Sequence, residues 1–81
     1  MITEQELDKL ADFGKVKDGS YCDGWQFSIV PKNHKRTMWD FYLFNELNGD
    51  LTFIKQLEDI TDLEEIYYML SEPKQELEYI K

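Results

Sequence analysis

The sequence predicts a single α+β domain, residues 1–81, built as a two-layer sandwich with the element order α-β-β-β-α. Apolar residues recur at helical spacing near both ends of the chain, and alternating apolar runs separated by turn signals fill the middle. We therefore expect a three-stranded antiparallel meander packed against an N-terminal and a C-terminal helix. A short final strand at the end of the chain is an alternative that would make the sheet four-stranded.

The first helix is predicted over 4–13. Thr3 followed by Glu6 fits a capping box, in which the two residues satisfy each other's backbone N–H groups. Leu7 begins an apolar face, and Gly14 is placed to end the helix in a left-handed conformation. We expect this helix to pack against the sheet.

Residues 15–24 are interpreted as a connector, because two Asp-Gly pairs in this segment mark tight turns. The next run, 25–30, alternates between apolar and polar residues as a half-buried strand does. Trp25, Phe27 and Ile29 fall on one face of it.

The register of the last two strands, 38–45 and 51–57, decides which face becomes the core. A two-residue turn at Asn48-Gly49 would mix apolar and polar residues on both faces. A three-residue loop over 47–49 gathers the large apolar side chains on one face. It pairs Glu46 with Asp50, Leu43 with Phe53 and Trp39 with Leu57. Several large side chains at ~1.5–3 kcal/mol each outweigh the local turn preference, so we predict the three-residue loop.

This register gives the sheet an inward face and a second, uncovered apolar group. The inward face comprises Trp25, Phe27, Ile29, Trp39, Phe41, Leu43, Leu51, Phe53 and Leu57. The opposite face carries Val30, Met38, Tyr42, Phe44 and Ile54. Contiguous apolar patches on small proteins often mark partner surfaces, so we expect Met38, Tyr42, Phe44 and Ile54 to contact a partner.

The second helix is predicted over 62–71. Thr61 and Glu64 fit another capping box, and the apolar residues that follow recur at i, i+3, i+4 and i+7. Pro73 ends this pattern. The tail, 76–81, alternates weakly enough to form either an edge strand or a frayed helix, and we favour the edge strand.

Composition limits the classes of function. The formal net charge is −8, of which residues 58–81 contribute −6. This balance argues against nucleic acid or an anionic membrane as the main partner, because binding to polyanions requires Lys and Arg. A single cysteine, Cys22, indicates a reducing compartment, and no signal peptide or apolar span is evident. We expect a soluble cytoplasmic protein.

No catalytic, cofactor or metal site is expected. Cys22 and His34 lack an orienting acid and an anion hole, and the acidic loops fail the spacing of a calcium-binding EF-hand. One basic cluster, Lys32, Lys35 and Arg36, is interpreted as a solvated hairpin tip. Contact with nucleic acid, and docking of this tip on an acidic spot of a partner or of a second copy, are the alternatives.

Acidic residues collect around the second helix, and they have two interpretations. The group comprises Glu58, Asp59, Asp62, Glu64, Glu65 and Glu72. Such residues keep a helix surface solvated and favour the helix dipole. A row of uncompensated carboxylates can also imitate the phosphates of DNA and bind a basic protein surface. In that case Glu58, Asp62, Glu64 and Glu65 would steer the partner.

These features favour a non-enzymatic inhibitor or adaptor that occupies a basic surface of another protein, including a surface that binds nucleic acid. Virus-encoded anti-defence proteins, such as anti-CRISPR proteins, and nuclease-immunity proteins share this profile of size and charge. The alternative is a small homodimeric structural or regulatory protein that pairs through the open sheet face.

Overall fold

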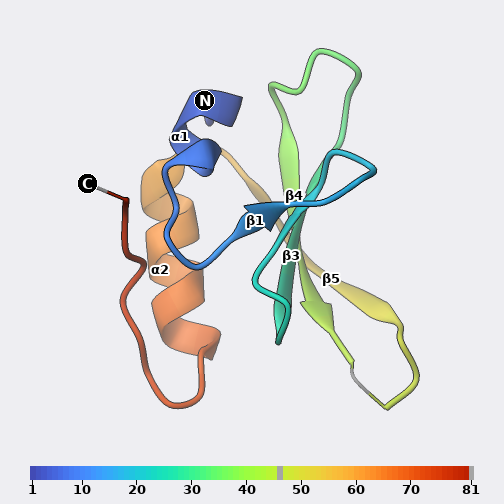
Figure 1. Cartoon of the computed structure of the whole chain (residues 1–81), viewed down its shortest axis with the longest axis vertical. Helices are drawn as coiled ribbons and strands as arrows, with labels where there is room; N and C mark the ends of the chain where they lie inside the picture. Colours follow the sequence, from blue (N-terminus) through green and yellow to red (C-terminus); the bar gives the residue numbers. More distant parts are fainter. Residues whose placement is uncertain (46, 81) are drawn as a thin grey trace.

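Two layers, one of helices and one of strands, make up the computed structural model, which describes residues 1–45 and 47–80 (Figure 1). The elements are α1 (Glu4–Asp8), β1 (Gly14–Lys15), β2 (Tyr21–Cys22), β3 (Phe27–Pro31), β4 (Trp39–Phe44), β5 (Leu51–Leu57) and α2 (Ile60–Leu70). The strands form one antiparallel sheet in the order β1-β2-β3-β4-β5. The α+β prediction is confirmed, but within these residues the sheet has five strands instead of three or four.

The two additional strands come from the segment interpreted as a connector. The Asp18-Gly19 pair closes a hairpin, in which the backbone N–H of Ser20 donates to Asp18 Oδ1 at 2.9 Å and Gly19 has a φ of +90°. Lys15 pairs with Tyr21, and Tyr21 pairs in turn with Ile29 of β3. Strands of two residues are too short to show alternation, which is why the sequence pattern missed them.

Helix α1 is shorter than predicted. The capping box is confirmed: Glu6 N–H donates to Thr3 Oγ1, and Thr3 N–H donates to Glu6 Oε1 at 3.0 Å. The helix ends at Asp8 because the chain beyond it pairs with the C-terminal tail. Ala11 N–H donates to the carbonyl of Glu78, and Leu10 forms an isolated antiparallel bridge with Tyr79. The tail therefore makes a single bridge in place of the favoured edge strand.

Helix α2 begins earlier than predicted. Its N-cap is Asp59, which accepts a hydrogen bond from Asp62 N–H at 3.1 Å, so the prediction of Thr61 as the cap was wrong. Asp caps a helix at least as well as Thr. The earlier start also brings Ile60 against the core. The helix ends at Leu70, and the buried Ser71 follows it.

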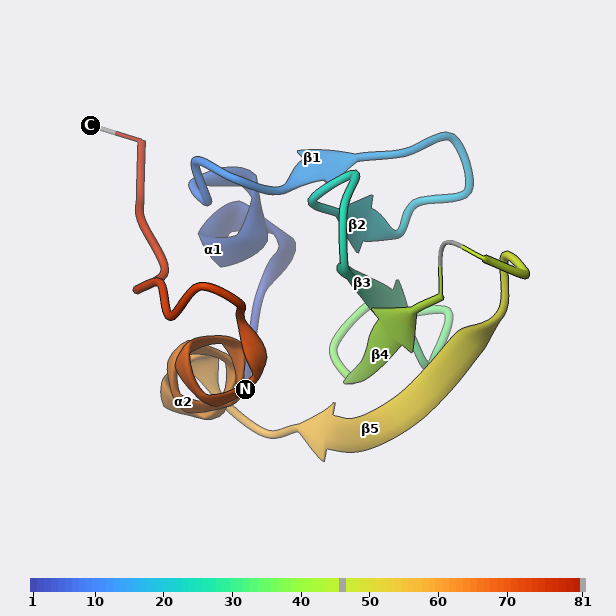
Figure 2. The same cartoon turned by 90° about the horizontal axis from the view of Figure 1, so that it is seen from below.

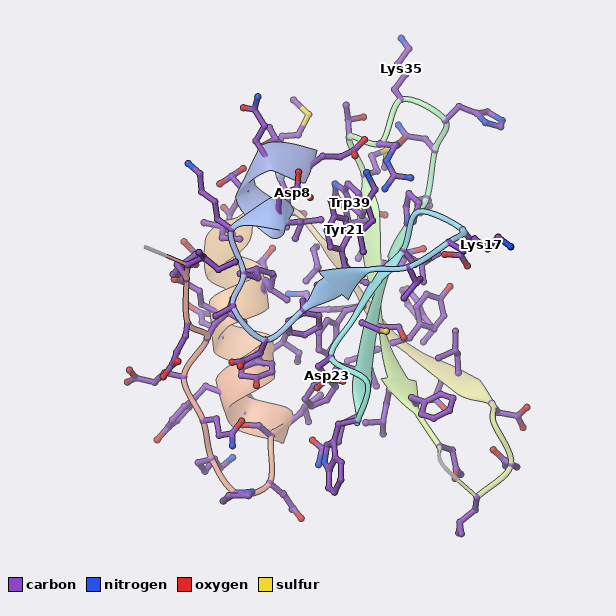
Figure 3. All side chains as sticks on the ribbon, in the orientation of Figure 1. Asp8, Lys17, Tyr21, Asp23, Lys35 and Trp39 are labelled. Carbon is purple, nitrogen blue, oxygen red and sulfur yellow. The ribbon has the colours of Figure 1, made fainter. Side chains whose placement is uncertain are left out.

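The core lies between the layers and is centred on Trp39, whose side chain is fully buried. The indole N–H of Trp39 donates to the carbonyl of Ile2 at 3.0 Å, and its ring packs edge-to-face on Tyr21. The helices and the segments near them contribute Ile2, Leu7, Leu10, Phe13, Leu63, Tyr67 and Leu77, and the sheet contributes Tyr21, Phe27, Ile29, Trp39, Phe41 and Leu57. Figure 3 shows the side chains of Tyr21 and Trp39 next to α1, of which Asp8 is the last residue.

The predicted register holds for only part of the β4–β5 hairpin. Trp39 pairs with Leu57 as predicted, and the same register continues to the pair of Phe41 with Lys55. Tyr42 then pairs with Phe53, so Ile54 is one extra residue in β5 and forms a β-bulge.

Beyond the bulge the hairpin loop differs from the prediction. It closes between Asn45 and Asp50, whose backbone N–H and C=O groups are 2.9 Å apart. Gly49 N–H also donates to the carbonyl of Asn45. The predicted pair of Glu46 with Asp50 involves a residue outside the described ranges.

The bulge moves several residues to the face opposite the one predicted. Phe53 and Leu51 pair with Tyr42 and Phe44 and share their outward face, while Ile54 packs against the core. Leu43 and Trp25, both predicted to lie inward, are also exposed. For the hairpin residues the reason is visible in Figure 1, where the loop end of the β4–β5 hairpin diverges from α2 and neither helix covers it.

The two tryptophans give a matched test of this arrangement. Trp39→Ala should lower the free energy of unfolding by about 3–5 kcal/mol, because it empties a fully buried site. Trp25→Ala should cost less than about 1 kcal/mol, because its side chain is largely exposed. Urea unfolding followed by circular dichroism measures both values. Equal losses would contradict the observed burial.

Tyr21 gives a test in alkaline solution. Burial, with a hydrogen bond to Asp8, raises the pKa of the Tyr21 phenol above its ordinary value of 10.0. The folded chain therefore keeps this proton at pH values where the unfolded chain loses it, and stability should fall as the pH rises above 10. Between pH 9 and pH 11 the free energy of unfolding should fall less in Tyr21→Phe than in wild type. Urea unfolding at both pH values measures it. If both proteins lose the same free energy of unfolding over this range, Tyr21 does not contribute to the pH dependence.

Candidate protein-binding surface

In the part of the chain that the structure describes, no helix packs on the outer face of the sheet. Both helices lie on the same side, as two perpendicular views show (Figures 1 and 2). Alternation along the paired strands assigns Cys22, Ser28, Val30, Asp40, Tyr42, Phe44, Leu51, Phe53 and Gln56 to the outer face. The half of this face that lies near the β3–β4 loop is mainly polar. In this half Lys32 Nζ donates to Gln56 Oε1 at 2.8 Å.

The other half is apolar and is called here the sheet-face patch, defined by Tyr42, Phe44, Leu51 and Phe53. The rings of Tyr42 and Phe53 meet edge-to-face, with their centroids 5.7 Å apart. Phe53 remains 54% exposed, and Leu51 and Phe44 are also exposed. Four large apolar side chains thus cover this half of the outer face.

The sequence predicted part of this patch. Tyr42 and Phe44 lie in it, but Leu51 and Phe53 were assigned to the core, and only the bulge places them here. Met38 is exposed just before β4, at the opposite end of that strand from Phe44.

Trp25 links the patch to the rest of the surface. Its side chain is 61% exposed and lines two hollows. The smaller, of about 200 Å³, also touches Cys22 and Ser28 on the outer face, together with Phe44. The larger, of about 310 Å³, opens toward α2 and is called here the acidic cleft.

Three separate parts of the chain meet around the acidic cleft. Its walls comprise Asp12, Asp23, Trp25, Gln26, Phe27, Tyr67, Ser71, Glu72, Pro73 and Gln75. Gln26 Nε2 donates to the carbonyl of Glu72 at 3.4 Å, which joins the β2–β3 loop to the segment after α2. Figure 3 shows Asp23 near the end of the sheet, on the side that faces α2.

Hydrogen bonds fix two sides of the cleft. Asp23 Oδ1 accepts the backbone N–H groups of Trp25, Gln26 and Phe27 at 2.9, 2.9 and 3.0 Å. On the opposite side, the Tyr67 hydroxyl donates to Gln75 Oε1 at 3.1 Å. Hydrogen bonds within the chain therefore fix the backbone and side chains on both of these sides.

Negative charge dominates the electrostatics of the cleft. Asp12, Asp23 and Glu72 line it, and no lysine or arginine does so among the residues described. Burial raises the pKa of the Tyr67 phenol, and the charges of Asp12, Asp23 and Glu78 raise it further. The nearby Lys74 donates its Nζ to the carbonyl of Met69 and lies over the ring of Tyr68, which is not part of the cleft lining.

Several acids around α2 have structural partners. Asp59 caps the helix, and Asp62 accepts from the backbone N–H of Glu58 at 2.9 Å and lies 3.6 Å from Lys55 Nζ. These contacts, led by the Glu58 N–H, lower the pKa of Asp62. Glu64 accepts from the hydroxyl of Tyr79 at 2.8 Å.

The predicted partner-binding residues therefore do not form one surface. Ile54 packs against the core, and Met38 lies at the end of β4 opposite Phe44. The structure brings Tyr42 and Phe44 together on the outer sheet face. It places Glu58, Asp62, Glu64 and Glu65 at or in α2, in the opposite layer.

The basic hairpin tip is mostly engaged within the chain. The Arg36 guanidinium contacts Glu4 and donates to the carbonyl of Gly19. Lys35 extends away from the molecule at the β3–β4 loop (Figure 3). Within 1–45 and 47–80, no three His, Cys, Asp or Glu side chains gather in a way that could hold a metal ion.

The chain matches no family model, and neither a curated protein nor a solved structure is significantly similar to it. The helices found in the described residues are too short or too polar to cross a membrane. The fold and its surfaces are therefore the basis for inferring a function.

Asp23 can be tested as the residue that shapes the cleft. Asp23→Ala should lower the free energy of unfolding by about 1–2 kcal/mol, because three backbone N–H groups lose their acceptor. Asp23→Asn retains an acceptor oxygen in the same place and should cost less than about 0.5 kcal/mol. Urea unfolding distinguishes the two variants, and equal losses would show that the negative charge matters more than the acceptor.

Proposed function

We propose that this chain is a non-enzymatic protein-binding inhibitor or adaptor that docks on a basic surface of another protein. The observation that carries the proposal is the one-sided sheet, whose uncovered face presents the aromatic sheet-face patch. Trp25 joins this patch to the acidic cleft, which opens toward α2. The patch would provide apolar burial, and the acids would provide charge complementarity.

The composition of the patch suits a binding anchor. Each buried Phe or Tyr removes roughly 150–250 Å² from water, and aromatic residues are enriched among the residues that dominate binding energy. Edge-to-face contact between Tyr42 and Phe53 holds the two rings in place before a partner arrives. Little side-chain freedom would then be lost on binding.

A basic partner follows from the charge. The net charge is −8, and the acidic cleft borders the patch at Trp25. Opposite charge accelerates encounter and selects against acidic partners. Inhibition of a protein that binds nucleic acid, in the cytoplasm and in the manner of anti-defence or nuclease-immunity proteins, is the form of this function that we favour.

The open face also supports a second candidate, a homodimer that pairs patch to patch. Pairing through the β5 edge of the sheet is less suitable, because β5 carries the bulge and Lys55, two features that discourage the addition of another strand. Face-to-face pairing would bury the same four side chains of the patch. It would need no foreign partner.

Paired variants test the patch. Tyr42→Ser with Phe53→Ser should weaken binding to a purified partner by about 30-fold or more, the loss expected for hot-spot residues. The matched control, Tyr68→Ser with Met69→Ser, removes exposed apolar side chains from α2 and should leave binding within about threefold. The partner would first be captured from the native host, identified by mass spectrometry and purified. Calorimetric titration then measures the affinities.

Two results would contradict the proposal. Equal losses in the patch and control variants would show that the patch is not the binding surface. A dimer in light scattering at tens of micromolar, converted to a monomer by the patch variant, would favour the homodimer instead.

A further inference from the structure

The acidic cleft has the chemistry of a receptor for a single cationic side chain. Aromatic rings and carboxylates line the same hollow of about 310 Å³, next to the exposed indole of Trp25. We propose that this cleft receives an arginine side chain of the protein partner. The inference rests on the proposed function and specifies which group of the basic partner is recognised.

The aromatic wall favours a flat cation. Trp25, Phe27 and Tyr67 line the cleft, and the rings of Phe27 and Tyr67 meet at a centroid distance of 5.5 Å. Phe27 and Tyr67 are buried and make the inner wall apolar, so the exposed indole of Trp25 is the ring on which a guanidinium can stack. Trp is the strongest of these partners, and Trp25 is the most exposed of the three.

The carboxylates supply the counter-charge. Asp12 and Glu72 are exposed at the rim of the cleft and approach it from different segments of the chain. Asp23 is fixed by its three backbone hydrogen bonds, so its charge cannot move away from the cleft. Since Lys74 is bound to the carbonyl of Met69, the nearest basic side chain after α2 does not neutralise this charge.

Arginine suits the site better than lysine or a metal ion. Guanidinium is planar, donates up to five N–H groups and is more weakly hydrated than an ammonium group, so it tolerates an apolar wall. It also forms paired hydrogen bonds with carboxylates. A metal ion would need several ligands converging on one point, and among the described residues no three His, Cys, Asp or Glu side chains gather in that way.

This sequence supplies no free arginine of its own. The sequence contains one arginine, Arg36. In the folded chain its guanidinium contacts Glu4 and the carbonyl of Gly19 and lies over the ring of Trp39, 5.1 Å from the centroid. A second copy of this chain therefore has no free arginine to insert.

NMR titration of the ¹⁵N-labelled chain tests the cleft directly, with N-acetyl-arginine amide as the probe. The indole N–H signal of Trp25 should shift and saturate at probe concentrations on the order of millimolar, as expected for a few exposed contacts. The indole N–H of Trp39, buried and bonded to Ile2, serves as an internal control and should not move. N-acetyl-citrulline amide, a neutral molecule of nearly the same shape, should bind roughly tenfold more weakly or worse.

A matched pair of variants locates the effect. Asp12→Asn with Glu72→Gln should weaken binding of the arginine probe about tenfold, because it removes two charges at the cleft. Glu58→Gln with Glu65→Gln removes the same charge from exposed sites at α2 and should leave binding within about twofold. An immobile Trp25 signal, equal binding of the citrulline compound, or equal weakening in both variants would overturn the inference.

Measurement against the purified partner separates this inference from the proposed function. The cleft variant should lose about tenfold in affinity for the partner. If the cleft variant binds the partner normally while the sheet-face patch variant does not, the inference fails and the proposed function stands. If the patch variant also binds normally, the proposed function fails as well.

Discussion

One extra residue in β5 determines what the outer surface of this protein presents. Ile54 has no partner residue in β4, so the pairing shifts between Phe41–Lys55 and Tyr42–Phe53. Side chains alternate along a strand, and a shift of one residue therefore exchanges the two faces for everything beyond it. Before the bulge, β5 sends Leu57 into the core. After it, Phe53 and Leu51 turn outward to join Tyr42 and Phe44.

The bulge is placed where the helix layer stops supporting the sheet. Near Trp39 and Leu57 the inward face packs on the helices, and burial there fixes the register. Toward the loop the hairpin diverges from α2 and no surface remains for the inward face to cover (Figure 1). Local hydrogen bonds between Asn45, Gly49 and Asp50 then decide the pairing in place of burial.

The extent of the helix layer explains which parts of the fold could be predicted from the sequence. Caps and alternation act over a few residues, so Thr3, Glu6 and the bounds of β5 were correctly predicted. The second predicted cap, Thr61, was wrong because Asp59 starts α2 earlier. The register argument assumed that every large apolar residue of the hairpin could find cover. Trp39 and Phe41 are buried as assumed, but Leu43 is exposed. The position of α2, which decides this, cannot be deduced from the hairpin's own residues.

The candidate site was predictable only in part for a related reason. Tyr42 and Phe44 alternate with core residues and could be found by pattern. The acidic cleft joins Asp12, Trp25 and Glu72, which are far apart in sequence and meet only because the segment after α2 returns past the β2–β3 loop. The acids of α2 formed the more obvious pattern, yet Asp62 and Glu64 are bound within the chain.

Charge and apolar exposure in this protein are linked by solubility. A small domain that leaves four large apolar side chains on one face risks self-association, and a net charge of −8 opposes it by mutual repulsion. The same charge has no such effect against a basic protein. The excess of acidic residues would therefore keep the sheet-face patch from pairing with a second copy and still permit a basic partner to approach. The negative charge would then have a role even where individual carboxylates make no contact with the partner.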